Sequence, residues 1–415
     1  MSQTGSTATA SYREVFGNRE FTGLIVAQVL SECGDQIARV GLAVLILART
    51  DNPFLAALAF VVGYVPAIFG AALLGPFADR VSRRTVMLVA DMGRAVLIGL
   101  LALLAVPSTP VWLLFALLFL AELLSAPFEA ARAAVLPDVL PDPRHYLRGA
   151  GLSRVLSQVD QVLGLALAGV VVALISPRGA LVTDAVTFAL SFAVVLLTLR
   201  RRPAPLQARG GIAGYLHDLQ RGAAQVAGDP VRRCLVLFAW GAAAFMIAPE
   251  AVALAYAESG GNSAAVGTVL MAALPAGGAL GAILVSRWPP GDQTRAILPL
   301  ALASCLPLVL TGASPPVLIA TALWFVAGVG QGFMVPLIAT VNLLTPAHSR
   351  GRVNGLAAAG FNVGSASAFA LAGLGAAVLS PALVVLLAGI AGIVVCVVAW
   401  TRWPRDALAA AVAPG

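Results

Sequence analysis

The sequence predicts an all-α integral membrane protein with twelve transmembrane helices in two parallel six-helix repeats. Three observations predict this fold class: the composition, the number of long apolar runs, and an internal repeat. Apolar residues make up 60% of the 415 residues and charged residues only 11%, whereas soluble domains carry about a quarter charged residues. Because so little charge cannot cover a water-facing surface, we expect a lipid bilayer to surround most of the chain.

Twelve apolar runs are long enough to cross a bilayer as helices. A membrane-spanning helix needs roughly 17–25 predominantly apolar residues, and polar or Pro-rich breaks such as TDNP at 50–53 separate these runs. The predicted spans are 20–48, 53–75, 85–106, 110–133, 149–175, 178–199, 232–257, 264–286, 295–312, 316–340, 350–379 and 381–401.

Polar segments divide the chain into a tail, a bundle, a linker, a second bundle and a second tail. The longest polar segment follows the sixth span and contains GYLHDLQRGAAQV, which is typical of a short amphipathic helix at the membrane surface. The predicted domains are a cytoplasmic N-terminal tail (1–19), an N-terminal six-helix bundle (20–199), a cytoplasmic linker (200–231), a C-terminal six-helix bundle (232–401) and a cytoplasmic C-terminal tail (402–415).

The distribution of arginines predicts the orientation. All 26 basic residues are arginines. Twenty of them fall on the side that holds both termini, and only Arg49 and Arg178 fall on the other side. The remaining four lie within the predicted spans and are Arg39, Arg94, Arg132 and Arg154. Since cytoplasmic loops carry an excess of basic residues, both termini are predicted to be cytoplasmic. The net charge of +7 therefore indicates membrane orientation and not a nucleic-acid partner. The absence of lysine and the abundance of Ala, Gly and Pro suggest a GC-rich bacterial coding sequence. The predicted location is therefore the bacterial inner (plasma) membrane.

The two halves of the sequence repeat each other. A constant offset of 209 residues aligns Pro66 with Pro275, Pro127 with Pro336, Pro137 with Pro346, Gly151 with Gly360 and Gly164 with Gly373. An even number of spans per half gives the repeats parallel topology, which places a substrate site near the membrane midplane between two halves that rock against each other. The alternative is an old duplication that is retained only for packing.

The loop between the second and third spans carries the most specific motif. GPFADRVSRR, from Gly75 to Arg84, resembles the G-x-L-A-D-R-x-G-R-[RK] loop of the major facilitator superfamily. The resemblance implies that Asp79 lies at the N-terminus of the eleventh span, where the helix dipole favours a carboxylate, and forms a latch that opens when the cytoplasmic side opens. The alternative is a solvated turn that merely follows the positive-inside rule. The predicted cytoplasmic gate comprises Gly75, Asp79, Arg80, Arg83, Arg84 and Arg132.

Longer segments are similar to one branch of that superfamily. GDQIARVGLAVLILART, VMLVADMGRAV, APFEAARAAVLPDVLP, GALVTDAVTFALSF and SRGRVNGL resemble the macrolide-efflux and enterobactin exporters, which are drug and siderophore exporters driven by proton antiport. One feature departs from the antiporter pattern: the fifth span reads GLALAG at 164–169, with Leu165 where antiporters of the superfamily usually have proline.

The first span carries the most informative polar side chains. Gln28, Glu32, Asp35 and Arg39 share one face of a helix because their spacing is i, i+4, i+7 and i+11. An ionised carboxylate at mid-membrane costs about 2.5–3.5 kcal/mol on insertion scales, so we expect Glu32 and Asp35 to face the central cavity and to alternate between protonation and substrate binding. The alternative is an Asp35–Arg39 ion pair that only packs the span.

Polar residues in other spans are predicted to complete the cavity, although each could equally be a satisfied helix contact. Charge is concentrated in the N-terminal half, so we expect proton coupling there and a mainly apolar substrate pocket in the C-terminal half. Asp91 and Arg94 are interpreted as a local ion pair, and Asp160 as pointing away from the cavity face. The predicted cavity residues are Gln28, Arg39, Glu122, Gln158, Gln161, Gln331 and Asn362.

The sequence carries no motif of a soluble enzyme. The absence of lysine excludes a P-loop, and the four cysteines and three histidines lack the spacing of metal ligands, so we expect no enzyme activity, cofactor or metal. The leading hypothesis is a monomeric exporter that exchanges protons for a small amphipathic molecule such as a drug, siderophore or secondary metabolite. The alternatives are a proton-coupled nutrient symporter and a membrane scaffold or sensor that transports nothing.

Overall fold

Each predicted span coincides with one helix, or with two consecutive helices, in the computed structural model, which describes residues 12–78, 81–203, 211–346, 349–404 and 408. The N-terminal helices are α1 (Tyr12–Phe16), α2 (Arg19–Thr50), α3 (Pro53–Ala78), α4 (Arg83–Leu104), α5 (Val111–Leu123), α6 (Ser125–Val139), α7 (Pro143–Leu174) and α8 (Pro177–Thr198). The later ones are α9 (Gly211–Ala227), α10 (Pro230–Ser259), α11 (Ala264–Ser286), α12 (Pro290–Arg295), α13 (Ile297–Leu310), α14 (Val317–Gly330), α15 (Met334–Leu343), α16 (Arg350–Val378) and α17 (Pro381–Thr401).

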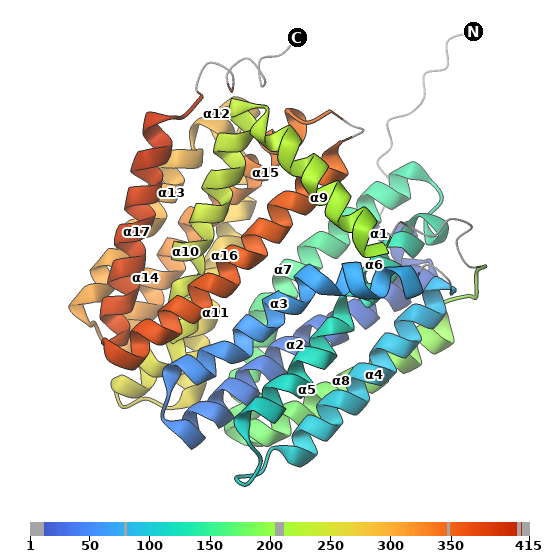
Figure 1. Ribbon diagram of the computed structural model, residues 1–415, viewed down its shortest axis with the longest axis horizontal. Helices are drawn as coiled ribbons and strands as arrows, with labels where there is room; N and C mark the ends of the chain where they lie inside the picture. The colour runs from blue at the N-terminus through green and yellow to red at the C-terminus, as the bar shows by residue number, and fades with distance from the viewer. Residues whose placement is uncertain (1–11, 79–80, 204–210, 347–348, 405–407, 409–415) are drawn as a thin grey trace.

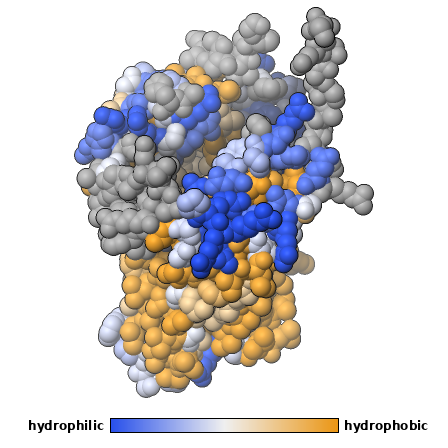
Figure 2. Space-filling view, turned by 90° about the vertical axis from the view of Figure 1, so that its right-hand side faces the viewer, coloured by the Kyte–Doolittle hydropathy of each residue, from blue (hydrophilic) through white to orange (hydrophobic). Residues whose placement is uncertain are grey.

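The apolar surface agrees with a membrane environment. Nine helices among the described residues are long and apolar enough to cross a bilayer, and two shorter apolar helices accompany them. Large apolar side chains project outward, among them Leu174, Leu318 and Val378, each at least 80% exposed. On the face that Figure 2 presents, a hydrophobic band covers the lower part of the molecule and hydrophilic residues gather above it. The predicted all-helical membrane fold is confirmed.

The helices form two bundles side by side (Figure 1). Helices α2 to α8 form the N-terminal bundle and α10 to α17 the C-terminal bundle, and α9 lies within the predicted linker and contacts α3 and α16. We call the end of the bundles at which α9 lies the linker end, and the opposite end, with the loops after α2 and α10, the far end. The bundles meet mainly through α3 against α16 and α7 against α11.

The fourth and tenth predicted spans are each interrupted at related positions. The fourth divides into α5 and α6 at Leu124, and the tenth divides into α14 and α15 at the 3₁₀ turn Gln331–Phe333. Pro127 and Pro336 follow these breaks by a few residues, and a proline removes the hydrogen bond to the carbonyl four residues earlier. Because these two prolines are related by the 209-residue offset, the repeat is visible in the backbone as well as in the sequence.

Short polar side chains begin several helices. Asn18 accepts hydrogen bonds from the backbone N–H groups of Glu20 and Phe21 and starts α2, and its own amide donates to the Val139 carbonyl. Asp142 starts α7 in the same way, and the hydrogen bond that its carboxylate accepts from the Arg144 N–H lowers the pKa of that carboxyl. These caps satisfy backbone donors that a helix end leaves unpaired.

Among the residues that the structure describes, the two bundles share a buried apolar core at the far end. At the far end a single cluster of buried side chains includes residues of both bundles, for example Leu42, Phe60, Val252 and Phe369. At the linker end the N-terminal bundle has a core of its own around Phe21 and the C-terminal bundle another. The bundles are therefore closed against each other by apolar contacts at the far end.

Two glycines let the bundles approach closely near the far end. A Cβ atom on Gly373 of α16 would lie 2.6 Å from the Ala57 Cβ and 3.1 Å from the Phe54 Cα of α3. A Cβ atom on Gly169 of α7 would lie 3.2 Å from the Ala265 carbonyl oxygen of α11. Any larger residue would push the two bundles apart at these points.

Candidate functional site

Gln28 and Glu32 on α2 meet polar side chains of α6 and α7. The Gln28 amide donates to the Ser157 hydroxyl at 2.8 Å and to the Ser153 carbonyl at 3.0 Å, and its oxygen accepts a hydrogen bond from Arg132 of α6. The Ser157 hydroxyl donates to the Glu32 carboxylate at 3.1 Å, and the Arg132 guanidinium lies 3.5 Å from the same carboxylate. Glu32 is thus held by one loose ion pair and one hydrogen bond.

Asp35, one turn further along α2, pairs with α4. The Arg94 guanidinium donates to the Asp35 carboxylate at 2.5 Å and to the Ser31 hydroxyl at 2.9 Å. Beneath it, the Phe188 ring of α8 lies with its centroid 4.0 Å from the guanidinium carbon, which adds a cation–π contact. Arg94 therefore ties α2, α4 and α8 together.

Arg39, the last polar residue of this face, forms a bidentate ion pair. Its guanidinium donates to both oxygens of Glu122 on α5, at 2.7 and 3.0 Å. Two parallel N–H···O bonds are the strongest arrangement of this pair, which explains why Arg39 binds Glu122 and not Asp35. The alternative of a closed Asp35–Arg39 pair is therefore wrong for this structure, and so is the local Asp91–Arg94 pair, since the Arg94 guanidinium hydrogen-bonds to Asp35.

Exposure separates the three carboxylates. The Glu32 side chain is 22% exposed and Asp35 15%, whereas Glu122 is only 4% exposed. A group exchanges protons or ligands with water only where water reaches it, so Glu32 and Asp35 are the candidates for a working site. Glu122 is better suited to hold Arg39 in place.

The remaining predicted cavity residues lie outside this network. Gln161 on α7 and Asn362 on α16 are half-buried. Gln331 is 8% exposed, and its amide nitrogen has no hydrogen-bond partner among the described residues. The side chain of Gln158 lies outside the described residues. The predicted contribution of Gln331 and Asn362 to a cavity therefore stays a prediction.

The predicted gate loop is described only in part. Gly75 lies within α3, and Asp79 and Arg80 lie outside the described residues. Arg83 donates to the Ala134 carbonyl at 2.5 Å and pairs with Asp138 of α6 at 2.6 Å, and Arg84 donates to the Leu196 carbonyl of α8 at 2.7 Å. These two arginines fasten the start of α4 to its own bundle.

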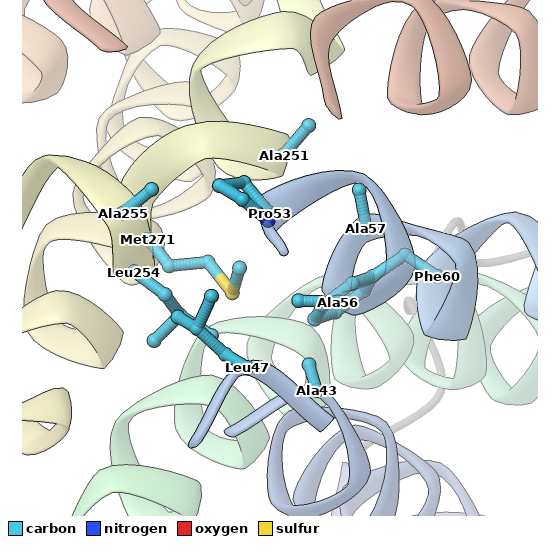
Figure 3. A pocket seen from close by; sticks show the side chains of 10 residues that line it. All are labelled: Ala43, Leu47, Pro53, Ala56, Ala57, Phe60, Ala251, Leu254, Ala255 and Met271. Atoms are coloured by element: carbon cyan, nitrogen blue, oxygen red, sulfur yellow. The ribbon is translucent and has the colours of Figure 1, made fainter. Parts of the chain in front are cut away.

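The seam at the far end is apolar and aromatic. Phe60 of α3 stacks on Phe369 of α16 with 5.1 Å between ring centroids, and Tyr64 lies 5.7 Å from the same ring. A small pocket opens beside this stack (Figure 3), where Met271 and Leu254 of the C-terminal bundle face Leu47 and other side chains of α2 and α3. Within the described part of the chain, none of the ion pairs joins the two bundles across this seam.

Sequence reasoning missed several partners of the site. Ser153 and Ser157 are spaced i and i+4 on α7, which could have indicated one polar face. Asp184 of α8 is completely buried, and its position inside the apolar run TDAVTFALSF was the available signal. Asp160, predicted to point away, is buried against the Cys33 thiol of α2, which lies 3.6 Å from its carbonyl oxygen.

Comparison with known proteins identifies the family model that fits the chain. Residues 24–342 match the model of the Major Facilitator Superfamily. Two proteins of Bacillus subtilis (strain 168), both described as uncharacterized MFS-type transporters, are similar over part of their length. YkuC is 29% identical over 180 residues, covering 43% of this chain and 41% of YkuC. YfiS is 29% identical over 181 residues, covering 43% and 42%. The chain thus spans about two fifths of the length of each of these relatives.

Solved structures share the fold at low sequence identity. The nucleoside transporter NupG has a TM-score of 0.73 at 13% identity, with 93% of this chain and 99% of that chain covered. An auto-inhibited POT family peptide transporter has a TM-score of 0.69 at 12% identity, with 92% and 96% covered. At such identities the likeness concerns the fold and not the substrate.

Proposed function

Because the chain belongs to the major facilitator superfamily, we propose that it is a secondary transporter that exports a small amphipathic molecule in exchange for protons. The observation that carries this proposal is the position of Glu32 and Asp35. Both carboxylates lie mid-way along α2, both remain partly exposed, and each pairs with an arginine from another helix. Protonation of the carboxylate, or binding of a cationic ligand to it, would release that arginine. Because the arginine belongs to another helix, its release would loosen the contact between the two helices.

The far-end seam supports alternating access. If the linker end is cytoplasmic, as the arginine distribution predicts, then the apolar core shared at the far end closes the outer side, and the two separate cores leave the inner side free to open. This corresponds to an inward-facing state, in which a cytoplasmic substrate would enter. The substrate would then enter from the cytoplasm and bind near Glu32 and Asp35 before the far-end seam opens.

The gate loop would stabilise the opposite state. By resemblance, Asp79 would bind the N-terminus of α16 when the cytoplasmic side closes. We expect Asp79→Asn to shift the population toward the inward-facing state, measured as greater alkylation of single cysteines placed at the linker end. An unchanged labelling pattern would reject the latch.

The pocket composition favours an amphipathic substrate. The charges described above lie in the N-terminal bundle, while the C-terminal bundle offers amides such as Gln331 and Asn362 among apolar side chains. The second candidate is proton-coupled uptake of a nutrient by symport on the same fold. The third, a scaffold or sensor, predicts no transport at all.

Transport assays separate these candidates. Purified protein in proteoliposomes is tested with a panel of amphipathic drugs and siderophores, and with nucleosides and peptides, under an imposed proton gradient of either sign. Export by antiport predicts that a compound moves against the proton flux, and that Glu32→Gln and Asp35→Asn lose the gradient-driven component. Glu258→Gln, which changes an exposed carboxylate at the end of α10, is the matched control. Movement of the compound with the protons would instead identify a symporter.

A further inference from the structure

A second group of buried charges adjoins Asp35. Asp91 of α4 and Asp184 of α8 are both completely buried, and Arg94 is 1% exposed. The Ser191 hydroxyl donates to Asp91 at 2.7 Å, and the Thr187 hydroxyl donates to Asp184 at 3.2 Å. The Arg94 guanidinium contacts Asp35 directly, at 2.5 Å, whereas Asp91 and Asp184 form no ion pair with it and lie only within electrostatic reach.

The packing of α2 against α8 makes room for this cluster. A Cβ atom on Gly34 of α2 would lie 2.3 Å from an oxygen of Asp184 and 2.2 Å from the Thr187 hydroxyl. Only a glycine allows the Asp184 carboxyl group to come so close to the α2 backbone. The aspartate is therefore accommodated by a specific feature of the neighbouring helix.

The charges in the cluster do not balance. Three carboxyl groups lie within electrostatic reach of one guanidinium, and of the three only Asp35 contacts it. The adjacent Arg39–Glu122 pair, which also interacts with Asp35, is already neutral. A buried carboxylate without a compensating cation costs several kcal/mol or more. One ionised aspartate suffices to neutralise Arg94, so the cost of burying an unpaired charge favours a neutral form for the other two carboxyl groups.

Unpartnered atoms mark where protons can reside. Among the described residues, one carboxyl oxygen of Asp91, one of Asp184 and the Nε atom of Arg94 are buried without a hydrogen-bond partner. Native proteins leave few buried polar atoms unsatisfied. Protonation of Asp91 or Asp184 at this oxygen would neutralise a carboxylate whose negative charge has no hydrogen-bond donor there.

We propose that Asp35, Asp91 and Asp184 form one shared proton-binding site around Arg94, which holds two protons in this conformation and opens to water through Asp35. This inference rests on the proposed proton coupling and extends it to two buried residues. When a proton moves from Asp91 or Asp184 onto Asp35, the donor becomes the carboxylate that neutralises Arg94. The total charge stays constant, so the transfer needs no other ion. Asp35, the only partly exposed member, then exchanges its proton with water.

Infrared spectroscopy of the purified protein in lipid nanodiscs tests this site without any substrate or gradient. A neutral carboxyl group has a carbonyl stretching band that a carboxylate lacks. The part of this band that disappears in the Asp91→Asn/Asp184→Asn double variant belongs to the cluster. We expect Asp35→Asn to remove about half of that part, because Arg94 then requires Asp91 or Asp184 to ionise. Glu258→Gln should leave it unchanged.

Two outcomes overturn the proposal. If the double variant leaves the band as in the native protein, Asp91 and Asp184 are ionised and hold no proton. If Asp35→Asn leaves the cluster band intact, the three residues do not share a site. Thermal unfolding supplies an independent check, since an amide has the shape of a neutral acid: Asp184→Asn should fold and melt close to the native protein, and a failure to fold would show that the carboxylate is required. If the native protein shows the cluster band but no gradient-driven transport, the proposed function is refuted and the proton-binding site is not.

Discussion

At the scale of single residues, we interpret the Arg39–Glu122 pair as a contact that stabilises the protein and does not itself bind protons or substrate. Both partners are hydrogen-bonded twice, and Glu122 is 4% exposed. Removing one partner of a buried ion pair leaves the other charge uncompensated, whereas removing both is often nearly neutral.

We therefore expect Glu122→Gln to destabilise the N-terminal bundle by up to about 3 kcal/mol, less than the full cost of breaking a buried pair, because the Arg39 side chain is 20% exposed. The double variant Arg39→Gln/Glu122→Gln should recover most of this loss. The measurement is reversible unfolding in detergent, with Glu258→Gln as the control. A single variant as stable as the native protein would mean that the pair is not buried in the membrane.

Residue positions were predictable from the sequence where one helix decides them. The i, i+4, i+7, i+11 spacing placed Gln28, Glu32, Asp35 and Arg39 on one face of α2. Their partners were not predictable, because Arg132, Arg94 and Glu122 come from α6, α4 and α5. Local pairs such as Asp35 with Arg39 were the only ones that spacing could suggest, and bidentate geometry across helices outcompeted them.

At the scale of helices, close packing against glycine sets how the bundles meet. Gly373 brings α16 against α3 at the end where the shared core lies. Because the carbon of a larger side chain would meet the Phe54 backbone, the contact cannot adapt by rotating a side chain.

We expect Gly373→Leu to weaken closure at the far end and to increase the labelling of single cysteines placed beside the pocket of Figure 3. Gly99→Leu on α4 is the matched control, since nothing lies within 4 Å of the Cβ position there. Equal labelling of both variants would show that this contact does not hold the seam shut.

Helix positions followed from apolar run length, because a span has a fixed minimum length in the bilayer. The breaks at Leu124 and at Gln331–Phe333 were not predicted, although the prolines that follow them were aligned by the repeat. A proline changes the hydrogen-bonding pattern locally, and whether the helix kinks or stops depends on packing, which one sequence does not reveal.

At the scale of the whole molecule, the family and the fold were predictable from composition, repeat and loop motif. The sequence did not predict which end of the bundles is closed. Apolar residues occur at both ends, so the pattern is equally compatible with closure at the far end and with closure at the linker end. Only the distribution of the three cores over the two ends distinguishes them.

Orientation remains a prediction that one experiment decides. We expect both termini to be cytoplasmic, since arginines are concentrated in the loops of the linker end. A C-terminal green fluorescent protein fusion should then be fluorescent and a C-terminal alkaline phosphatase fusion inactive. The same reporters fused after Thr50 should give the opposite result; a phosphatase-active C-terminus would invert the assignment of inner and outer sides.

The most direct test of proton coupling is the proton movement that accompanies transport. Native protein is reconstituted with a pH-sensitive dye in the vesicle lumen, and a transported compound is added to the outside without an imposed gradient. Antiport predicts that protons leave the lumen as the compound enters, so that the lumen becomes more alkaline, and that Glu32→Gln abolishes this change while Glu258→Gln keeps it. Compound entry with no change in luminal pH, or an undiminished change in Glu32→Gln, would contradict the account.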